Sequence, residues 1–362
     1  MTRSTLSSRD SAEVSTASTP PIARRAVLGL GLFSAFSRGF AQIAATSIPK
    51  VDLHHHFFAP GPLKPFMSRY PTPKPILAYT PAQSIAAMDQ AGVETAFLSS
   101  PVLFGDDPAL VREAVASARG LNEFGARIVG DHNGRFGLFA VLPLPQVDPS
   151  LREIDYAYAV LKADGVAMMT SYGDRWLGDP AFQPVLDELN RRSAIVHIHP
   201  QAAPCCQNLI PGTDPVRIEY NTDTSRAIWT MIKDSASTPS AASRYPRIRF
   251  IWSHAGGSLL GLVGRFLIGP ESSAEALRST PKPNSRLYHL RRFYYDTAAS
   301  YNPVQMQALK MLVGARQIVF GSDFPMAPIP AVTSGLDQCG FDEQELRGVY
   351  RDNALSILRT RR

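Results

Sequence analysis

The 362-residue sequence has few cysteines, and their positions do not favour disulfide bonds. The three are Cys205, Cys206 and Cys339, and because two of them are adjacent they cannot build a disulfide framework. No Cys-X-X-Cys pair occurs, which argues against a thiolate zinc site. The sequence is therefore neither that of a disulfide-stapled scaffold nor that of a zinc finger.

Long hydrophobic runs and a strong charge of one sign are also absent. No apolar run is long enough to span a bilayer in the mature protein. The formal net charge is +6 at pH 7, but five arginines against Asp10 and Glu13 place +3 of it in residues 1–41. The rest forms no basic stripe interleaved with aromatic residues, so nucleic-acid binding is not indicated.

Residues 1–41 have the order of an export signal. A Ser- and Thr-rich stretch precedes Arg24 and Arg25, and a short apolar run and small residues follow them. The paired arginines and the glycine-rich, weakly hydrophobic run favour a twin-arginine signal. We predict this signal at 1–41, a linker at 42–48, export machinery as a partner and a periplasmic location. The alternative is a disordered tail on a cytoplasmic enzyme.

From residue 49 onward, short apolar runs alternate with helical patterns. Eight strands are predicted, at 50–56, 93–99, 136–142, 165–170, 194–199, 249–254, 292–296 and 317–322. Helix starts are marked by a capping side chain followed by proline, at Thr80-Pro81, Asp107-Pro108 and Asp179-Pro180. Eight alternations favour an α/β fold of the (β/α)8 TIM-barrel type, a single domain over 49–362. A doubly wound open sheet is the alternative, but its usual glycine-rich first turn is replaced here by histidines.

Two segments exceed what a minimal barrel needs. Residues 57–80 are proline-rich and follow the first strand, and residues 200–220 follow the fifth. Both leave the C-terminal ends of strands, where barrel enzymes place the elements that cover a substrate. We therefore predict loop insertions after strands one and five.

Two histidines share one face of the first predicted strand. Because side chains alternate along a strand, His54 and His56 point one way and His55 points the other. Two imidazoles on one face near a strand end make a natural pair of metal ligands. His132 and His289 lie before predicted strands instead of at their ends, so we interpret them as structural.

Three further candidates end later strands. Pro200 terminates the fifth strand, which puts His199 at its rim. His254 ends the sixth strand, and Asp323 follows the eighth. His197 shares the face of His199 but lies one layer deeper, so we interpret it as a buried, hydrogen-bonded core residue. Each residue alone has an ordinary structural explanation. Together, in a chain with eight histidines, these strand ends indicate a shared site.

These motifs resemble the amidohydrolase superfamily. They are His-X-His on strand one, His-Pro on strand five, Ser-His-Ala-Gly-Gly on strand six and Gly-Ser-Asp-Phe-Pro on strand eight. Within the superfamily, the chain is similar to the branch that contains aminocarboxymuconate-semialdehyde decarboxylase. Segments 134–145 and 171–180 look most like the 6-methylsalicylate decarboxylase type. The likeness covers about residues 49–360.

The resemblance implies a mononuclear metal site. Binuclear members carry a carbamylated lysine at the end of strand four, whereas here that strand ends in two methionines and a threonine. By the family pattern, His54, His56 and His199 bind one divalent metal. Asp323 lies beside the ion or on it, and His254 is an acid/base next to the ligands. Such a ligand set suits Zn²⁺, with Mn²⁺ as the alternative.

The resemblance favours a decarboxylase of a small hydroxylated aromatic or unsaturated carboxylic acid. In this hypothesis, Asp323 protonates the ring carbon if the site raises its pKa, and His254 polarises substrate or water. The alternative is a mononuclear metal-dependent hydrolase of a lactone, ester or amide, in which Asp323 accepts a proton from activated water. A barrel that binds without catalysis would lack one of these groups, and none is missing.

Four aromatic residues close to the site motifs are candidates for lining a substrate pocket: Phe57, Phe58, Tyr172 and Phe324. Hydrophobic anchoring of loops explains each of them equally well. The expected partner is a small-molecule carboxylic acid, with no nucleic acid. The sequence leaves a homo-oligomer open.

Overall fold

The computed structural model describes residues 48–59, 79–101, 111–207, 209–235 and 237–359. The export signal predicted at 1–41, and all of the linker at 42–48 but its last residue, lie outside the described residues, so both stay predictions. In the part of the chain that is described, no helix is long and apolar enough to cross a membrane.

Eight parallel strands form one sheet in the order β1-β2-β3-β4-β7-β8-β9-β10. Their bounds are β1 Lys50–His56, β2 Val93–Ser99, β3 Phe136–Val141, β4 Gly165–Met169, β7 Ile195–His199, β8 Arg249–Trp252, β9 Tyr294–Asp296 and β10 Ile318–Val319. The chain after β10 returns to β1, where the Leu53 N–H donates to the Phe320 carbonyl and the Asp323 N–H to the His54 carbonyl, both at 2.9 Å. The predicted (β/α)8 barrel is thus confirmed.

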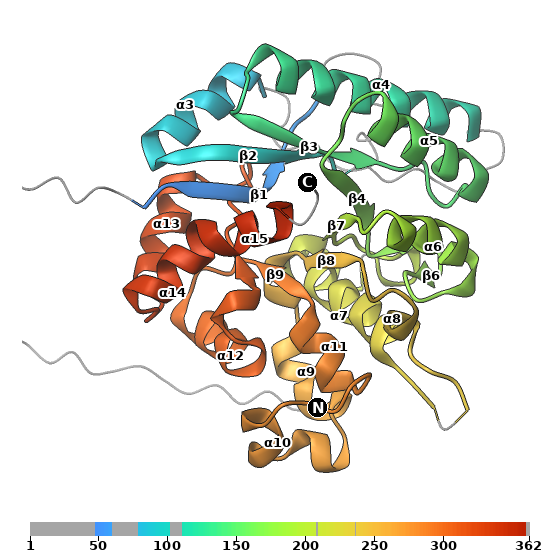
Figure 1. Cartoon of the computed structure of the whole chain (residues 1–362), viewed down its shortest axis with the longest axis vertical. Coiled ribbons are helices and arrows are strands. Elements are labelled where there is room, and N and C mark those ends of the chain that lie inside the picture. The colour runs from blue at the N-terminus through green and yellow to red at the C-terminus, as the bar shows by residue number, and fades with distance from the viewer. Residues whose placement is uncertain (1–47, 60–78, 102–110, 208, 236, 360–362) are drawn as a thin grey trace, which may run out of the picture. The chain divides into compact units, whose positions relative to one another are not determined.

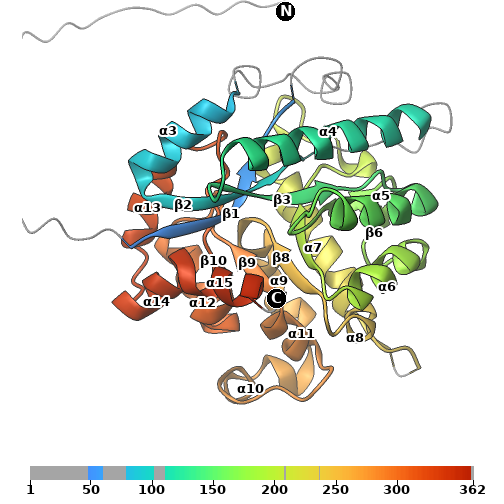
Figure 2. The same cartoon turned by 45° about the horizontal axis from the view of Figure 1, so that its top comes forward.

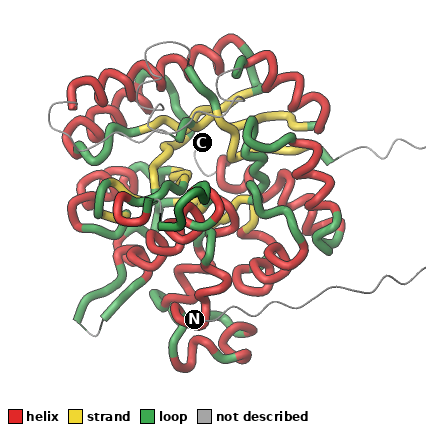
Figure 3. Tube along the Cα trace, turned by 180° about the vertical axis from the view of Figure 1, so that it is seen from behind, coloured by secondary structure: helices red, strands yellow, loops and turns green. Residues whose placement is uncertain are grey.

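Helices surround the strands, as Figures 1 and 3 show. Their bounds are α3 Pro81–Ala91, α4 Val111–Asp131, α5 Val147–Ala159, α6 Gln183–Arg191, α7 Glu219–Ile232, α8 Ala241–Arg244, α9 Leu259–Phe266, α10 Ala274–Arg278, α11 Arg286–Arg292, α12 Pro303–Val313, α13 Ile329–Asp337, α14 Glu343–Arg347 and α15 Asn353–Arg359. A short hairpin of β5 (Ser171–Tyr172) and β6 (Arg175–Trp176) follows β4. Figure 2 shows α10 lying away from the strands.

Two of the predicted helix starts fall on described residues, and both are capped. Thr80 forms a capping box with Gln83 at the start of α3. The side chain of each residue accepts a hydrogen bond from the backbone N–H of the other. Asp179 accepts a hydrogen bond from the Ala181 N–H, but here a 3-10 turn comes first and α6 begins only at Gln183. The start predicted at residues 107–108 lies outside the described residues.

The sixth and eighth strands of the barrel, β8 and β10, are shorter than their sequence patterns suggest. His254 and Asp323, which end or follow the sixth and eighth predicted strands, have positive φ angles of 54° and 62°. This left-handed conformation is uncommon for residues other than glycine and does not continue a strand. Gly321 lets the chain approach β1, because a Cβ at this position would lie 2.7 Å from the His54 Cβ.

The insertion predicted after the fifth strand is present as irregular chain with two 3-10 turns, at Pro204–Cys206 and Pro215–Arg217. It is slightly shorter than 200–220, because α7 begins at Glu219. Of the insertion predicted at 57–80, residues 60–78 lie outside the described residues.

Candidate metal centre

The alternation predicted for the first strand is present in β1. His55 turns away from the barrel interior, where its Nδ1 lies 3.0 Å from Asp52 Oδ2 and its Nε2 lies 2.9 Å from Ser84 Oγ on α3. His54 and His56 turn the other way, and their Nε2 atoms lie 3.1 Å apart. The alternation of side chains along β1 therefore places two imidazoles close together at the mouth of the barrel.

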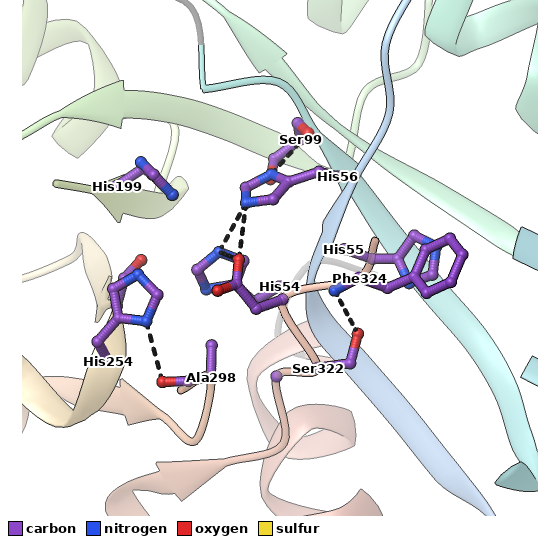
Figure 4. Close-up of polar contacts among 12 residues, drawn as sticks. His54, His55, His56, Ser99, His199, His254, Ala298, Ser322 and Phe324 are labelled. Atoms are coloured by element: carbon purple, nitrogen blue, oxygen red, sulfur yellow. Dashed lines mark hydrogen bonds and ion pairs between the residues drawn. The ribbon is translucent and has the colours of Figure 1, made fainter. Parts of the chain in front are cut away.

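The structure brings the four predicted ligands together from β1, β7 and the segment after β10. Asp323 Oδ1 lies 3.1 Å from His56 Nε2 and 3.3 Å from His54 Nε2. With His199, these residues offer four ligand atoms that all lie within 4.8 Å of one another. Figure 4 shows the His54, His56 and His199 rings arranged around a common space, with His254 beside them.

The donor set fits one divalent metal ion. Two ligand atoms that each lie about 2.0–2.1 Å from a tetrahedral ion are about 3.4 Å apart, which is close to the 3.1 and 3.3 Å spacings here. Three imidazole nitrogens and a carboxylate oxygen suit Zn²⁺ and Mn²⁺. All four side chains are buried, so a bound ion would be shielded from bulk water.

The His199 imidazole is neutral and has a nitrogen ready to bind. Burial, followed by the neighbouring His56 and His54, holds the pKa of His199 well below its usual value. Its Nδ1 donates to the Pro200 carbonyl at 2.8 Å, which leaves the lone pair of Nε2 for a ligand. A neutral imidazole with an oriented second nitrogen is the form that binds a metal.

Two carboxylates make this point of the barrel attractive to positive charge. Burial favours the neutral form of His54, but Asp296 and Asp323 outweigh it and raise the pKa of His54 to about 10. Burial would raise the pKa of Asp323, but its hydrogen bonds with His54 and His56 hold it well below the usual value. The raised pKa that would make Asp323 an acid is therefore not found. Asp323 therefore has to accept a proton before it can donate one.

His254 lies next to this cluster without joining it. Its ring centroid is 5.1 Å from that of His54, but its nitrogens are not among the four clustered ligand atoms. Its Nδ1 donates to the Ala298 carbonyl at 2.9 Å, so Nε2 is the atom left for a substrate. Figure 4 shows this contact. The position fits an acid/base that acts beside the metal ligands.

Asp296, the last residue of β9, connects the cluster to His254, and sequence reasoning missed it. Its Oδ2 accepts a hydrogen bond from His54 Nδ1 at 2.8 Å and lies 3.3 Å from His197 Nε2. Its Oδ1 accepts from the backbone N–H groups of His254, at 2.8 Å, and Ala298, at 3.1 Å. A signal was available, since this aspartate ends the seventh predicted strand as His199 ends the fifth.

Replacing Asp296 with asparagine is expected to weaken metal binding about 10- to 100-fold, the usual effect of removing a carboxylate that orients a ligating histidine. The amide preserves the size of the side chain but removes its negative charge. That charge makes the His54 imidazole a stronger electron-pair donor to a metal ion. Competition with a chromogenic chelator measures the affinity. Asp187→Asn on α6, whose carboxylate is about half exposed, is the control. Equal affinities for the two variants would contradict the role of Asp296.

Three further histidines lie outside the four-residue cluster, although His197 forms a second group of possible ligands with His54 and Asp296. His197 is fully buried and hydrogen-bonds through Nε2. His289 is also fully buried, its Nε2 lies within 3.1 Å of the Ser240 and Ser243 hydroxyls, and burial lowers its pKa to about 4. His132 packs edge-on against Phe136, the first residue of β3. None of these three belongs to the four-residue cluster.

Two of the aromatic candidates for the substrate pocket face away from the site. Phe57 is buried and stacks on Phe124 of α4, with ring centroids 6.3 Å apart. Phe324 stacks on His55, on the opposite side of β1 from the cluster, at 4.9 Å (Figure 4). Both therefore hold loops against the barrel, which was the alternative explanation for them.

The other two candidates lie near the site. The Phe58 ring is 6.2 Å from the His56 ring, and both are buried. Tyr172 is buried under the end of β4, where its oxygen accepts a hydrogen bond from the Met169 N–H at 2.8 Å. Burial raises the pKa of Tyr172, so its phenol keeps its proton.

Residues 51–360 match the family described as Amidohydrolase. The chain is 32% identical over 333 residues to decarboxylase yanB of Aspergillus niger, an alignment that covers 85% of this chain and 87% of that protein. It is also 32% identical over 322 residues to the 6-methylsalicylic acid decarboxylase of Penicillium expansum, covering 85% and 95%. Among solved structures, the dihydroxybenzoic acid decarboxylase of Polaromonas sp. JS666, with bound manganese and the inhibitor 2-nitroresorcinol, has the same fold. Its TM-score is 0.70 at 19% identity, over 87% of this chain and 98% of that one.

Proposed function

Because the chain belongs to the amidohydrolase family, we propose that it is a metal-dependent decarboxylase of a small hydroxylated aromatic acid. The observation that carries this proposal is the convergence of His54, His56, His199 and Asp323 in a chain that aligns with decarboxylases over 85% of its length. The substrate class is an ortho-hydroxybenzoic acid, since the relative from Penicillium expansum is named for 6-methylsalicylic acid.

The four clustered residues would hold one divalent ion, which would supply Lewis-acid stabilisation of negative charge on the substrate oxygens. Zn²⁺ suits the donor set, and Mn²⁺ is the alternative that the Polaromonas structure contains. Elemental analysis of protein purified without added metal identifies the ion.

Asp323 is the group that moves the proton. As a carboxylate, it accepts the proton of the substrate's phenol group and returns it to the ring carbon that bears the carboxylate. A C–H bond forms at that carbon, the C–C bond to the carboxylate breaks, and its electron pair restores the aromatic ring as CO2 leaves. The phenolate oxygen then takes a proton from solvent, so one hydroxybenzoate and one proton give one phenol and one CO2.

His254 holds the substrate during this transfer. Its Nδ1 is fixed by the Ala298 carbonyl, so Nε2 points to the space beside the cluster and can hydrogen-bond a substrate oxygen. Charge on that oxygen increases when the ring loses its aromaticity, and the imidazolium form of His254, which carries a proton on Nε2 as well, donates to that oxygen and lowers the barrier.

The proposal is tested by incubating metal-loaded protein with 6-methylsalicylate, salicylate and 2,6-dihydroxybenzoate while CO2 and the phenol product are measured together. We expect both products in equal amounts with at least one of these acids, and none from protein stripped of metal. A parallel panel of lactones, esters and amides addresses the hydrolase alternative. Turnover of that panel without CO2 release from any acid would overturn the decarboxylase assignment.

A further inference from the structure

A fully buried carboxylate that the proposed mechanism does not use lies on α7. The Oδ2 of Asp223 accepts hydrogen bonds from the Thr170 hydroxyl at 2.5 Å and the Ser171 hydroxyl at 2.8 Å. Its Oδ1 accepts from the Trp176 indole N–H at 2.6 Å, whereas the Arg226 guanidinium is 3.8 Å away, beyond hydrogen-bond distance. Burial of a carboxylate is costly unless its oxygens are hydrogen-bonded, so Asp223 holds all three donors in place.

The three donors belong to one segment at the mouth of the barrel. Thr170 directly follows β4, Ser171 begins β5 and Trp176 ends β6. Because β4 pairs with β7 and Met169 lies opposite His199, this segment starts beside the end of β7. Asp223 therefore fixes the chain next to a proposed metal ligand, although it lies on a different element.

The segment in turn holds the end of β7 at two points. The Thr170 N–H donates to the His199 carbonyl at 3.0 Å. The buried Gln201 side chain donates from Nε2 to the Ser171 Oγ at 3.0 Å and to the Ser171 carbonyl. Between these two points lies the Pro200 carbonyl, which accepts from His199 Nδ1 at 2.8 Å. That bond sets the direction of Nε2, the ligand atom of the ring.

We propose that Asp223 is a positioning residue for the metal centre. It fixes Ser171, which in turn holds the Gln201 side chain. The Pro200 carbonyl is thereby kept in place to orient the His199 ring. The carboxylate itself lies outside the four-residue cluster and does not touch the ion. The inference rests on the metal site of the proposed function and adds the contacts through which α7 supports it.

Asp223 would do for His199 what Asp296 does for His54, but over a longer path. Asp296 accepts directly from the Nδ1 of its ligand at 2.8 Å, whereas Asp223 acts through two intervening side chains. Removing a partner that orients a ligating histidine weakens metal binding about 10- to 100-fold. Because Asp223 acts indirectly, we expect an effect at the lower end of this range.

The alternative is that Asp223 only stabilises the packing of α7 against the barrel. Both roles predict a lower Tm when the carboxylate is removed, so stability does not separate them. Metal affinity does, because a residue that only stabilises the fold leaves the site of the folded protein unchanged.

The first test is Asp223→Asn, which preserves the size of the side chain. An amide nitrogen cannot accept a hydrogen bond, so at least one of the three donors loses its partner. The Kd for Zn²⁺, measured by competition with a chromogenic chelator at a temperature where all variants are folded, is expected to rise about 10-fold. A wild-type Kd together with a lower Tm would make Asp223 purely structural and overturn the proposal.

Ser225→Ala is the matched control. Ser225 is also buried on α7, but its hydroxyl bonds to the Asn221 carbonyl of the same helix at 3.2 Å and does not reach the β4 segment. This variant is expected to lower Tm and to leave the Kd for Zn²⁺ at the wild-type value. A Kd raised as much as in Asp223→Asn would mean that any damage to α7 weakens the site, which would overturn the specific role of Asp223.

The path itself is tested by Gln201→Leu, which keeps Asp223 and its three donors and removes only the amide that bonds to Ser171. This variant also raises the Kd for Zn²⁺. Because both changes break the same path, the double variant with Asp223→Asn is expected to raise Kd by less than the product of the two single effects. A rise equal to the product would mean independent action and would overturn the path. Failure of this inference is distinguishable from failure of the function, because Zn²⁺ affinity is measured without substrate, whereas the function is tested by CO2 release.

Discussion

Replacing His199 with alanine is expected to lower the bound metal from about one equivalent to a small fraction and to reduce kcat/KM by on the order of 10³-fold or more. His199 is the only ligand that β7 supplies to the cluster, and Pro200 ends the strand directly after it. No neighbour replaces it, because His197 lies one layer deeper with its Nε2 turned to Asp296. Elemental analysis and CO2 release from a hydroxybenzoate measure the two effects.

The matched control for this variant is His132→Ala. His132 is partly exposed at the end of α4, and its ring contacts only Phe136 among the described aromatic residues. Metal content and activity of the control stay at the wild-type level. If His199→Ala kept a full equivalent of metal, the four-residue site would be wrong, whatever the activity of the variant.

Replacing His254 with asparagine is expected to leave the metal content unchanged while kcat falls about 10²- to 10⁴-fold, the range for loss of a positioned acid/base. The amide can still donate to the Ala298 carbonyl, so the loop keeps its main hydrogen bond. The two readouts separate the roles of neighbouring histidines. His199→Ala loses metal and activity together, whereas His254→Asn loses activity alone.

Two results would contradict this assignment of His254. Loss of metal would make His254 a ligand, and wild-type kcat would remove it from the mechanism. Measuring kcat and KM separately adds a further distinction. A residue that only shapes the binding space changes mainly KM, whereas a group that acts in the transition state changes kcat.

The residues at the barrel mouth were predictable from local rules, and the resemblance to the amidohydrolase superfamily separated the four expected ligands from His254. Alternation along β1 separates His54 and His56 from His55, and a proline or a glycine-containing turn marks where a strand ends. In a parallel barrel all C-terminal strand ends meet at one rim, so candidates far apart in sequence can be assigned to one place before any coordinate is known. The number of strands and the site residues at or just beyond their ends were therefore determined by the sequence itself.

The orientation of side chains beyond those strand ends was decided only by tertiary packing. Phe57 and Phe324 follow directly after site residues, yet one ring stacks on Phe124 and the other on His55, because helices α3 and α4 cover the outer face of the barrel there. Position in sequence places a residue near a site, but the side of the backbone that it faces depends on what packs against it.

The contacts of Asp296 likewise required the folded chain. Asp296 is important because its two oxygens reach β1 and the turn at His254 at once, and no pattern within β9 encodes those partners. The sequence by itself determined the barrel and the residues at its mouth, since these follow from periodicity. Only the tertiary structure decided which charges and hydroxyls meet, because hydrogen bonding and burial depend on segments that are distant along the chain.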